Sequence, residues 1–313
     1  MRKLVIATRG SKLALWQSNH IKSLIESEFK DVEVELNVIV TSGDKILDVS
    51  LSKIGGKGLF LKEIEEALLR GEAHMAVHSL KDVPTVMPQG LKLAAITTRE
   101  DFRDAMLSEK YADVESLPIG AVIGTSSLRR RMQILSKRSD LVIKDLRGNV
   151  DTRIRKMRDG EYDAIILAAA GINRLGLRDS VKYFYELSDM LPAMGQGALG
   201  IETIDEPWVI EIASFLDDKN SHIESAIERE FVDTLNGGCQ VPIGVGAKVE
   251  GDEVVVRSIL GMPDASEVMG EEIRVSLSDI DGVGKSMAER LINQGALELL
   301  KKAEDMANRE IHI

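Results

Sequence analysis

A single cysteine is the side chain best suited to covalent chemistry in this 313-residue sequence. It ends the stretch Asn236-Gly237-Gly238-Cys239, and Pro242 follows three residues later. The glycines favour an open turn, and the proline prevents a helix from continuing through it. A thiol on such a loop can ionise to a nucleophilic thiolate and hold a group covalently. The alternative is a small apolar core residue, and spacing alone leaves both interpretations open.

Arginine is concentrated in one part of an otherwise acidic chain. The formal net charge is −11, yet residues 121–178 contain 13 Lys and Arg against 6 Asp and Glu. The same window holds 10 of the 20 arginines. Such a concentration predicts an anion-binding region, because guanidinium groups clamp carboxylate or phosphate through paired hydrogen bonds. The alternative is a solvated basic surface.

Within this window, hydroxyl and guanidinium groups stand between an expected strand and an expected helix. The stretch reads Thr125-Ser126-Ser127-Leu128-Arg129-Arg130-Arg131, and it is followed by Arg147-Gly148-Asn149-Val150, Arg153 and Arg174. Hydroxyls and free backbone N–H groups at a helix start can bind an anion. Three cations there oppose the helix dipole unless an anion is bound, which favours the binding interpretation. For Arg131, a solvent-facing position is the alternative.

A second polar cluster follows a buried strand expected at residues 75–79. It reads His78-Ser79-Leu80-Lys81-Asp82-Val83-Pro84. Asp82 is expected to project from the strand end into a cleft, where a carboxylate can stabilise a cation or transfer a proton. An ordinary turn aspartate is the alternative, and Lys81 is either an anion contact or a surface residue. A glycine-rich stretch, Gly55-Gly56-Lys57-Gly58, is expected to wrap an anion or to form a lid.

The apolar pattern predicts two similar α/β lobes with doubly wound mixed sheets, of the kind found in periplasmic binding proteins. Lobe 1 is expected to comprise residues 1–98 and 198–216, and lobe 2 residues 103–192. Strands are expected at residues 3–8, 32–40, 75–79, 91–97, 122–125 and 164–168. Ser11 is expected to cap the first helix. Anionic ligands of such sheets bind where strand ends meet helix starts, so we expect a cleft between the lobes.

The sequence pattern of the last third of the chain, residues 219–313, predicts a small α+β domain that presents Cys239. Its expected elements are a helix at 222–235, strands at 245–250, 253–260 and 273–277, and one long amphipathic helix over 281–306. The stretch Gly282-Val283-Gly284-Lys285-Ser286 resembles a phosphate-binding loop, but Asp279 stands where that loop requires glycine. We therefore interpret it as a helix start.

Composition narrows the class of protein. One cysteine excludes an internal disulfide framework and favours a reducing compartment. The apolar run after Met1 is too short for a signal peptide, and no segment is long enough to span a membrane, so we expect a cytoplasmic protein. Scattered histidines and the lack of a C-x-x-C motif predict no metal site. No large apolar stripe is evident, which favours a monomer.

These motifs, in this order, resemble the porphobilinogen deaminase (hydroxymethylbilane synthase) family of tetrapyrrole biosynthesis. The resemblance runs along essentially the whole chain. Besides the stretches quoted above, it includes Ala7-Thr8-Arg9-Gly10-Ser11-Lys12-Leu13-Ala14 and Met194-Gly195-Gln196-Gly197-Ala198.

The resemblance implies a dipyrromethane cofactor joined to Cys239 through a thioether. It further implies a transferase that deaminates four porphobilinogen molecules, joins them head to tail on this primer, and releases hydroxymethylbilane with water. Asp82 matches the catalytic carboxylate. The positions that match the cofactor-binding residues are Cys239, Lys81, Asp82, Ser79, Thr125, Ser127, Arg129, Arg130, Arg147 and Gly148. Those that match substrate-binding residues are Arg9, Ser11, Gln17, Lys57, Ser126, Arg153, Arg174 and Gln196.

Two other functions compete with this one. A two-lobed anion receptor of the periplasmic type would explain the two lobes. It would not explain the lack of a signal peptide or the third domain with its loop thiol. Nucleic-acid binding would use the arginine cluster. A net charge of −11 and only six Phe, four Tyr and two Trp argue against it, because bases would find few rings on which to stack.

Overall fold

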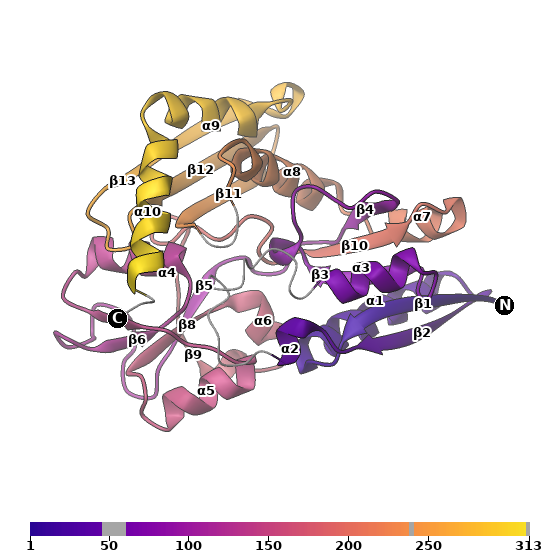
Figure 1. The fold of residues 1–313 in the computed structure, drawn as a ribbon, viewed down its shortest axis with the longest axis horizontal. Coiled ribbons are helices and arrows are strands. Elements are labelled where there is room, and N and C mark those ends of the chain that lie inside the picture. The colour runs from indigo at the N-terminus through magenta and orange to yellow at the C-terminus, as the bar shows by residue number, and fades with distance from the viewer. Residues whose placement is uncertain (46–60, 238–240, 311–313) are drawn as a thin grey trace.

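The computed structural model describes residues 1–45, 61–237 and 241–310. Within them the chain forms two five-stranded sheets and one three-stranded sheet. Figure 1 shows two lobes built on the larger sheets, with the domain of the smaller sheet lying across them. The expected fold class, two similar α/β lobes plus a small α+β domain, is confirmed.

The first lobe is built on the sheet β2-β1-β3-β10-β4. Its strands are β1 (Arg2–Arg9), β2 (Val32–Ile39), β3 (Met75–Ser79), β4 (Leu91–Ile96) and β10 (Leu199–Ile204). β1 runs parallel to β2 and β3, whereas β10 is antiparallel to its neighbours β3 and β4. The sheet is therefore mixed, and its antiparallel strand comes from a distant part of the sequence.

The second lobe repeats this arrangement in the sheet β7-β6-β8-β5-β9. Its strands are β5 (Asp104–Leu107), β6 (Val122–Gly124), β7 (Val142–Lys144), β8 (Ala164–Ala168) and β9 (Val181–Phe184). β6 is parallel to β7 and β8, and β5 is the antiparallel strand. The apolar pattern missed β5, β7 and β9, because strands of three or four residues show too little periodicity. The residue boundaries expected for the lobes stay a prediction.

Helices cover both faces of each large sheet, as in a doubly wound fold. In the first lobe, α1 (Lys12–Glu28) and α7 (Pro207–Ser214) pack on one face and α3 (Lys62–Leu69) on the other. In the second lobe, α4 (Leu128–Lys137) packs opposite α5 (Val150–Arg158) and α6 (Ala169–Arg174). A short α2 (Ser42–Lys45) follows β2. Ser11 caps α1 as expected, because its side chain accepts a hydrogen bond from Ala14 N at 3.3 Å.

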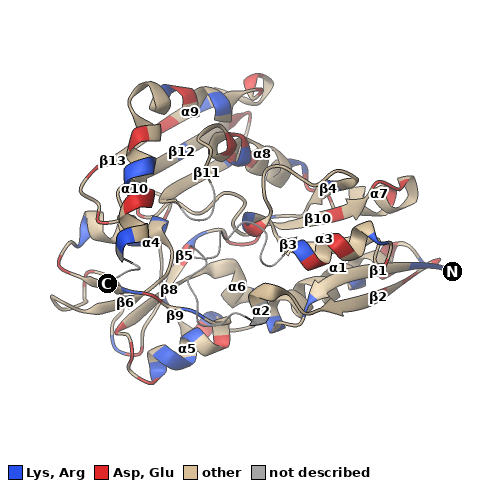
Figure 2. Ribbon diagram, in the orientation of Figure 1, with Lys and Arg blue, Asp and Glu red and all other residues tan. Residues whose placement is uncertain are grey.

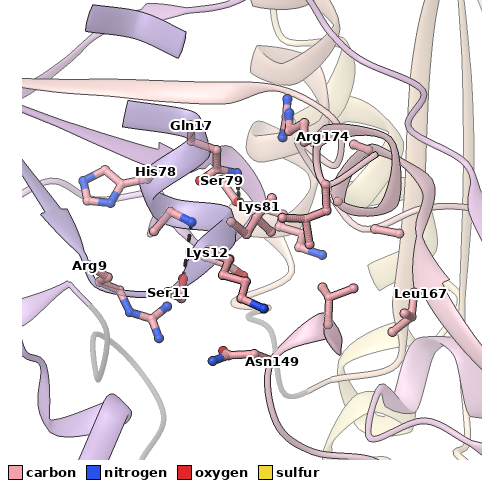
Figure 3. Close-up of a pocket in the computed structure, with 18 of the residues that line it drawn as sticks. Arg9, Ser11, Lys12, Gln17, His78, Ser79, Lys81, Asn149, Leu167 and Arg174 are labelled. Carbon is pink, nitrogen blue, oxygen red and sulfur yellow. Dashed lines mark hydrogen bonds between the residues drawn. The ribbon is translucent and has the colours of Figure 1, made fainter. Parts of the chain in front are cut away.

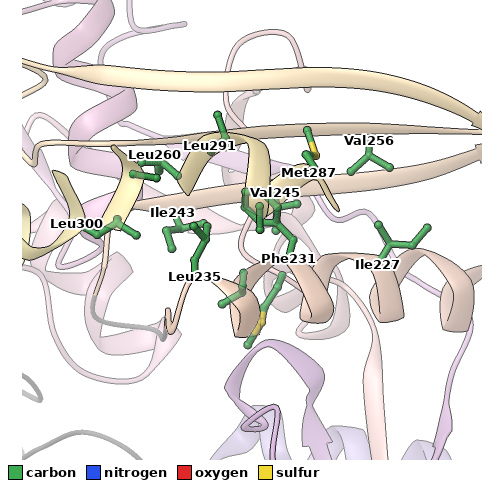
Figure 4. Close-up of a cluster of buried hydrophobic side chains, with 14 of the residues drawn as sticks. Ile227, Phe231, Leu235, Ile243, Val245, Val256, Leu260, Met287, Leu291 and Leu300 are labelled. Atoms are coloured by element: carbon green, nitrogen blue, oxygen red, sulfur yellow. The ribbon is translucent and has the colours of Figure 1, made fainter. Parts of the chain in front are cut away.

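The C-terminal domain packs three helices on an antiparallel sheet. The sheet holds β11 (Ile243–Glu250), β12 (Glu253–Gly261) and β13 (Val268–Ser276), and the helices are α8 (Lys219–Thr234), α9 (Val283–Asn293) and α10 (Ala296–Glu310). Figure 4 shows their shared core, in which Phe231 of α8, Val256 of β12 and Met287 of α9 are fully buried. The hairpin expected around Gly251-Asp252 is present, since Glu250 pairs with Glu253.

One expected element is wrong: residues 281–306 do not form a single helix. The chain breaks between α9 and α10 at Gly295, whose φ is 101°. Leu291 and Leu299, on opposite sides of the break, enter the same core. Apolar residues recur at helical spacing on both sides of Gly295, so the apolar pattern gave no indication of the turn between the two helices. The expected helix start is confirmed, because α9 begins at Val283.

Two segments cross between the lobes, and a buried glutamate of α8 joins them. Arg99, in the first crossing, lies 2.8 Å from Glu228 Oε1 through its Nη1 atom. Gly195, in the second crossing, donates its N–H to Glu228 Oε2 at 2.6 Å. Glu228 also accepts from Ala247 N of β11 at 2.9 Å. The C-terminal domain is thereby fixed to the two connections around which the lobes are arranged.

No helix in residues 1–45, 61–237 or 241–310 is both long and apolar enough to cross a membrane. Nor does this part of the chain place three or more His, Cys, Asp or Glu side chains where they could share a metal ion.

The break at Gly295 gives a test of the fold. We expect Gly295→Ala to lower the free energy of unfolding by about 1–2 kcal/mol, because an alanine at this φ is strained. No atom lies within 4 Å of the added Cβ, so the cost is conformational alone. Gly171→Ala, inside α6, is the control and should not destabilise. Urea unfolding followed by circular dichroism measures both, and equal effects would contradict the interpretation.

Candidate active site

A cavity of about 260 Å³ lies between the two lobes. Figure 3 shows side chains of α1 and β3 on one wall, including Ser11, Lys12 and Ser79, with Asn149, Leu167 and Arg174 of the second lobe opposite. Many of the residues predicted from the sequence meet here. They are Arg9, Ser11, Gln17, Ser79, Lys81, Asp82, Arg130, Gly148, Arg153, Arg174 and Gln196.

Asp82 reaches the cavity because of the short turn that ends β3. Residues Leu80–Asp82 form a single 3₁₀ turn, η2, directly after the strand. Leu80 and Val83 are buried in a small core beside this turn, with 0% and 1% of their surface exposed. Because these two apolar side chains take the inward positions, Lys81 and Asp82 are left to line the cavity. The strand end thus presents an acid and a base side by side.

The charge of Lys81 is opposed by its surroundings. Burial lowers the pKa of its amine, while the neighbouring Asp82 carboxylate raises it. Close by, Gln17 of α1 donates from Nε2 to Ser79 Oγ at 2.9 Å, which ties the helix to the end of β3. The first lobe therefore contributes a polar wall in which Asp82 is the acidic group and Arg9, Lys12 and Lys81 are the basic ones.

Two half-buried arginines of the second lobe bind backbone carbonyls. Arg153 donates from Nε to Gly148 O at 2.7 Å, and Arg174 donates from Nη2 to Gly197 O at 2.6 Å. Burial lowers the pKa of each guanidinium to about 10. For Arg153 the positive charge of Arg130 lowers the pKa further, and Asp82 across the cleft raises it. The cavity is therefore rich in positive charge and suited to a polyanionic ligand.

The arginines at the start of α4 have their anion within the protein. Asp104, the first residue of β5, is fully buried, with Arg129 Nη1 at 2.6 Å and Arg130 Nη2 at 2.7 Å from its carboxylate oxygens. Gln196 donates to the same carboxylate at 3.0 Å. Burial alone would raise the pKa of Asp104, but the two guanidinium groups hold it well below its usual range. Only Arg130 of this pair also lines the cavity.

The hydroxyls of residues 125–127 bind the main chain instead of lining the cavity. Thr125 Oγ1 accepts from Ser127 N at 3.2 Å, and Ser127 Oγ accepts from Arg130 N at 3.4 Å as the cap of α4. Ser126 Oγ donates to Leu146 O at 3.0 Å. These contacts shape the start of α4 and the loop before Arg147. A direct role for the three hydroxyls, for Arg129 and for Arg147 in ligand binding stays a prediction.

The remaining arginines of the basic window do not line the cavity. Figure 2 shows Lys and Arg on the outer helices α4 and α5 of the second lobe. Arg138 pairs with Asp140 at 2.6 Å and Arg158 with Glu109 at 3.2 Å, so these charges belong to the protein surface. Arg131 is half-buried and does not line the cavity. The solvated-surface interpretation therefore holds for part of the window.

Two predicted residues, Cys239 and Lys57, lie outside the described residues, as does the stretch Gly55-Gly56-Lys57-Gly58. The sequence pattern also missed residues that the structure brings to the cavity. His78, Asn149 and Leu167 line it, and Lys12 meets Asp151 of the other lobe at 2.9 Å. Asp104 was missed as well, although an acidic residue directly before the apolar run Ala105-Met106-Leu107 was a usable signal.

The fold and this cavity define a two-lobed α/β protein with a cation-lined cleft and one acidic side chain at a strand end. Residues 4–210 match the family profile "Porphobilinogen deaminase, dipyromethane cofactor binding domain", and residues 222–293 match "Porphobilinogen deaminase, C-terminal domain". The porphobilinogen deaminase of Sulfurimonas denitrificans is 62% identical over 98% of this chain and 99% of its own length. That of Campylobacter hominis is 57% identical over 98% and 100%. The chain belongs to the porphobilinogen deaminase family.

Among solved structures, the methionine-binding protein MetQ is similar over 72% of this chain and 93% of its own, with 12% identity and a TM-score of 0.45.

The cleft fits the dipyrromethane cofactor for which the first family profile is named. A dipyrromethane built from porphobilinogen carries an acetate and a propionate on each ring, and so is strongly anionic. Burial lowers the pKa of the Arg153 and Arg174 guanidinium groups, and a bound carboxylate would stabilise their charged form. Among the described residues, Gln196 Oε1 is buried without a hydrogen-bond partner, and as an acceptor it could bind a pyrrole N–H. Arg153, Arg174 and Lys81 would hold the carboxylates.

The buried carboxylate of Asp104 gives a second test. We expect Asp104→Asn to lower the free energy of unfolding by about 3–5 kcal/mol at neutral pH, because Arg129 and Arg130 would be left buried without a counter-charge. Since folding depresses the pKa of Asp104, this contribution is complete above its ordinary pKa of 3.8 and declines as the pH falls below that value. Urea unfolding across this pH range measures the difference.

The control for this experiment is Asp31→Asn, which breaks an exposed pair with Arg2 at 2.9 Å. Such surface pairs contribute about 0–1 kcal/mol. Equal losses in the two variants would show that Asp104 is not an energetic centre of the second lobe.

Proposed function

We propose that this protein deaminates four porphobilinogen molecules and joins them head to tail on a dipyrromethane primer held through a thioether at Cys239. Hydrolysis then releases hydroxymethylbilane. The protein acts in the cytoplasm as a monomer. The observation that carries the proposal is a cavity lined by cations of both lobes, with the Asp82 carboxylate at the end of β3 among them.

Charge balance is the first support for this function. Every porphobilinogen unit brings an acetate and a propionate, so a growing chain accumulates negative charge within the cleft. A buried charge without a partner costs several kcal/mol. Arg9 and Lys81 from the first lobe and Arg130, Arg153 and Arg174 from the second surround the cavity and can neutralise these groups. Cations from both lobes allow successive rings to be held along the cleft.

The position of Asp82 is the second support. When bound, the dipyrromethane supplies the free α-position of its terminal ring, to which each substrate unit is added. Loss of ammonia leaves a positive charge on the incoming pyrrole, and the Asp82 carboxylate stabilises that charge and accepts hydrogen bonds from pyrrole N–H groups. One such contact contributes about 3–4 kcal/mol to the stability of a transition state from which water is excluded. The positive charges of Lys81 and Arg153 both interact with the negative charge of Asp82.

Removing the charge of Asp82 tests this role. We expect Asp82→Asn to fold and to keep the cofactor, while turnover falls by about 100-fold to 1,000-fold because the cation loses its counter-charge. Steady-state assays with porphobilinogen and intact-protein mass spectrometry measure both properties. Asp205→Asn, which removes an exposed partner of Lys92, is the matched control. A wild-type rate for Asp82→Asn would refute the catalytic assignment.

Intact mass tests the covalent primer. Cys239 is the only cysteine, so a thioether can form at no other thiol. We expect the purified protein to exceed its sequence mass by one dipyrromethane, and Cys239→Ser to lack both the increment and turnover. A bare polypeptide that still polymerises pyrroles would contradict the proposal. A bare polypeptide that binds anions without turnover would favour a receptor instead.

A further inference from the structure

Two side chains of helix α8 hold the turn that follows Asp82. Arg229 donates from Nη1 to Val83 O at 2.9 Å and from Nη2 to Pro84 O at 2.5 Å. Four residues further along α8, Asp233 Oδ1 accepts from Thr85 Oγ1 at 2.6 Å. Residues four apart lie on the same helix face. Three consecutive residues after Asp82 are thus bound by one face of α8, which Figure 1 shows beside the connection from β3 to β4.

These contacts complete the restraints on the turn. On its inner side, Val83 donates its N–H to Leu80 O at 3.0 Å and is buried. The proline that follows restricts Val83 to an extended conformation, which it adopts with φ −83° and ψ 124°. The backbone carbonyls of Val83 and Pro84 are bound by Arg229, whose planar guanidinium group donates to both. The backbone on the C-terminal side of Asp82 therefore has little freedom while Arg229 is in place.

Helix α8 is a rigid support for this clamp. Glu228, next to Arg229 in the sequence, is the buried glutamate that binds Arg99 and Gly195 of the two crossing segments. Burial lowers the pKa of Arg229, and Asp233 raises it. The guanidinium thus reaches the Asp82 turn from a helix that is itself fixed to the junction of the three domains.

The same end of α8 leads toward the cysteine. Asn236 donates its N–H to Asp233 O at 2.8 Å, and Gly237 donates to Val232 O at 2.9 Å, which closes the last turn of the helix. In the sequence, Cys239 follows Gly237 by two positions. One short stretch of α8 therefore grips the turn after Asp82 and also begins the segment that carries the cysteine.

We propose that Arg229, supported by Asp233, is a positioning residue that sets the Asp82 carboxylate in the cleft. This inference rests on the proposed function. Arg229 does not line the cavity, so it acts through the turn and not on the substrate. A displacement of about 1 Å at a reacting group can cost about 100-fold in rate. A clamp from α8 therefore fixes the backbone that carries the carboxylate.

If Arg229 only stabilises the domain interface and does not position Asp82, a different result is expected. Loss of Arg229 would then weaken the packing of the C-terminal domain on the first lobe and lower the unfolding midpoint. Turnover per folded, cofactor-loaded molecule would stay unchanged. The two interpretations therefore separate when kcat is normalised to the loaded fraction measured by intact mass.

The experiment compares Arg229→Lys and Arg229→Ala with the matched control Arg257→Ala. Arg257 lies in the same domain and pairs with Glu272 at 2.8 Å. We expect kcat of loaded Arg229→Ala to fall by about 10-fold to 100-fold with a smaller change in KM. Arg229→Lys should lose less, since an amine can bind one of the two carbonyls. Arg257→Ala should retain the wild-type kcat, and added guanidinium should partly restore Arg229→Ala.

A double-mutant comparison tests whether Arg229 acts through Asp82. In an Asp82→Asn background, Arg229→Lys should cause no further loss of single-turnover rate, because the positioned carboxylate is already absent. Additive losses would overturn the proposal, as would an unchanged kcat in loaded Arg229→Ala and Arg229→Lys.

If Arg229→Ala does not fold, Arg229→Lys and the pair Thr85→Val with Asp233→Asn decide the outcome, and a wild-type kcat in both would again overturn the proposal. The proposed function has its own separate check. A wild-type protein without added mass or without turnover would refute the function whatever the variants show.

Discussion

The buried carboxylate of Asp104 is the interaction on which the second lobe and its cleft depend. It receives hydrogen bonds from Arg129 and Arg130 of α4 and from Gln196 of the crossing segment. A carboxylate with no exposed surface is tolerated only when every partner is present, so β5, α4 and the crossing segment must assemble together. Arg130 extends from this assembly into the cavity, and the internal ion cluster thereby continues into the ligand site.

The cleft differs from this buried ion cluster, because positively charged side chains line its surface. Arg153 and Arg174 bind backbone carbonyls, and burial lowers the pKa of both guanidinium groups. Asp104 pairs with Arg129 and Arg130 within the protein, whereas Arg153 and Arg174 line the cavity. A product that gains carboxylates with every addition, as the proposed function requires, would suit such a surface, and Asp82 would supply a negative charge at the strand end.

The third domain joins these parts. Glu228 of α8 binds both segments that connect the lobes, and its neighbour Arg229 binds the turn after Asp82. Long-range contacts of this kind leave no periodic trace in a sequence. The Asp82 turn itself was predictable, because a buried strand, a polar pair and a proline follow one another directly. The strand β5 and the turn at Gly295 were not, because one is too short and the other interrupts a pattern that resumes in phase with the core.

The sequence by itself determined the local chemistry: a lone cysteine after two glycines, an acid and a base after β3, a serine cap before α1, and ordered motifs that identify the family. Those features depend on neighbours within a few residues. Only the tertiary structure decided which arginines pair with Asp104 and which line the cavity. Arg129 and Arg153 look alike in the sequence, and they differ because Asp104, distant from both in the chain, lies beside the first and not the second. Burial and counter-charge are properties of the folded chain, so residue type alone could not assign them.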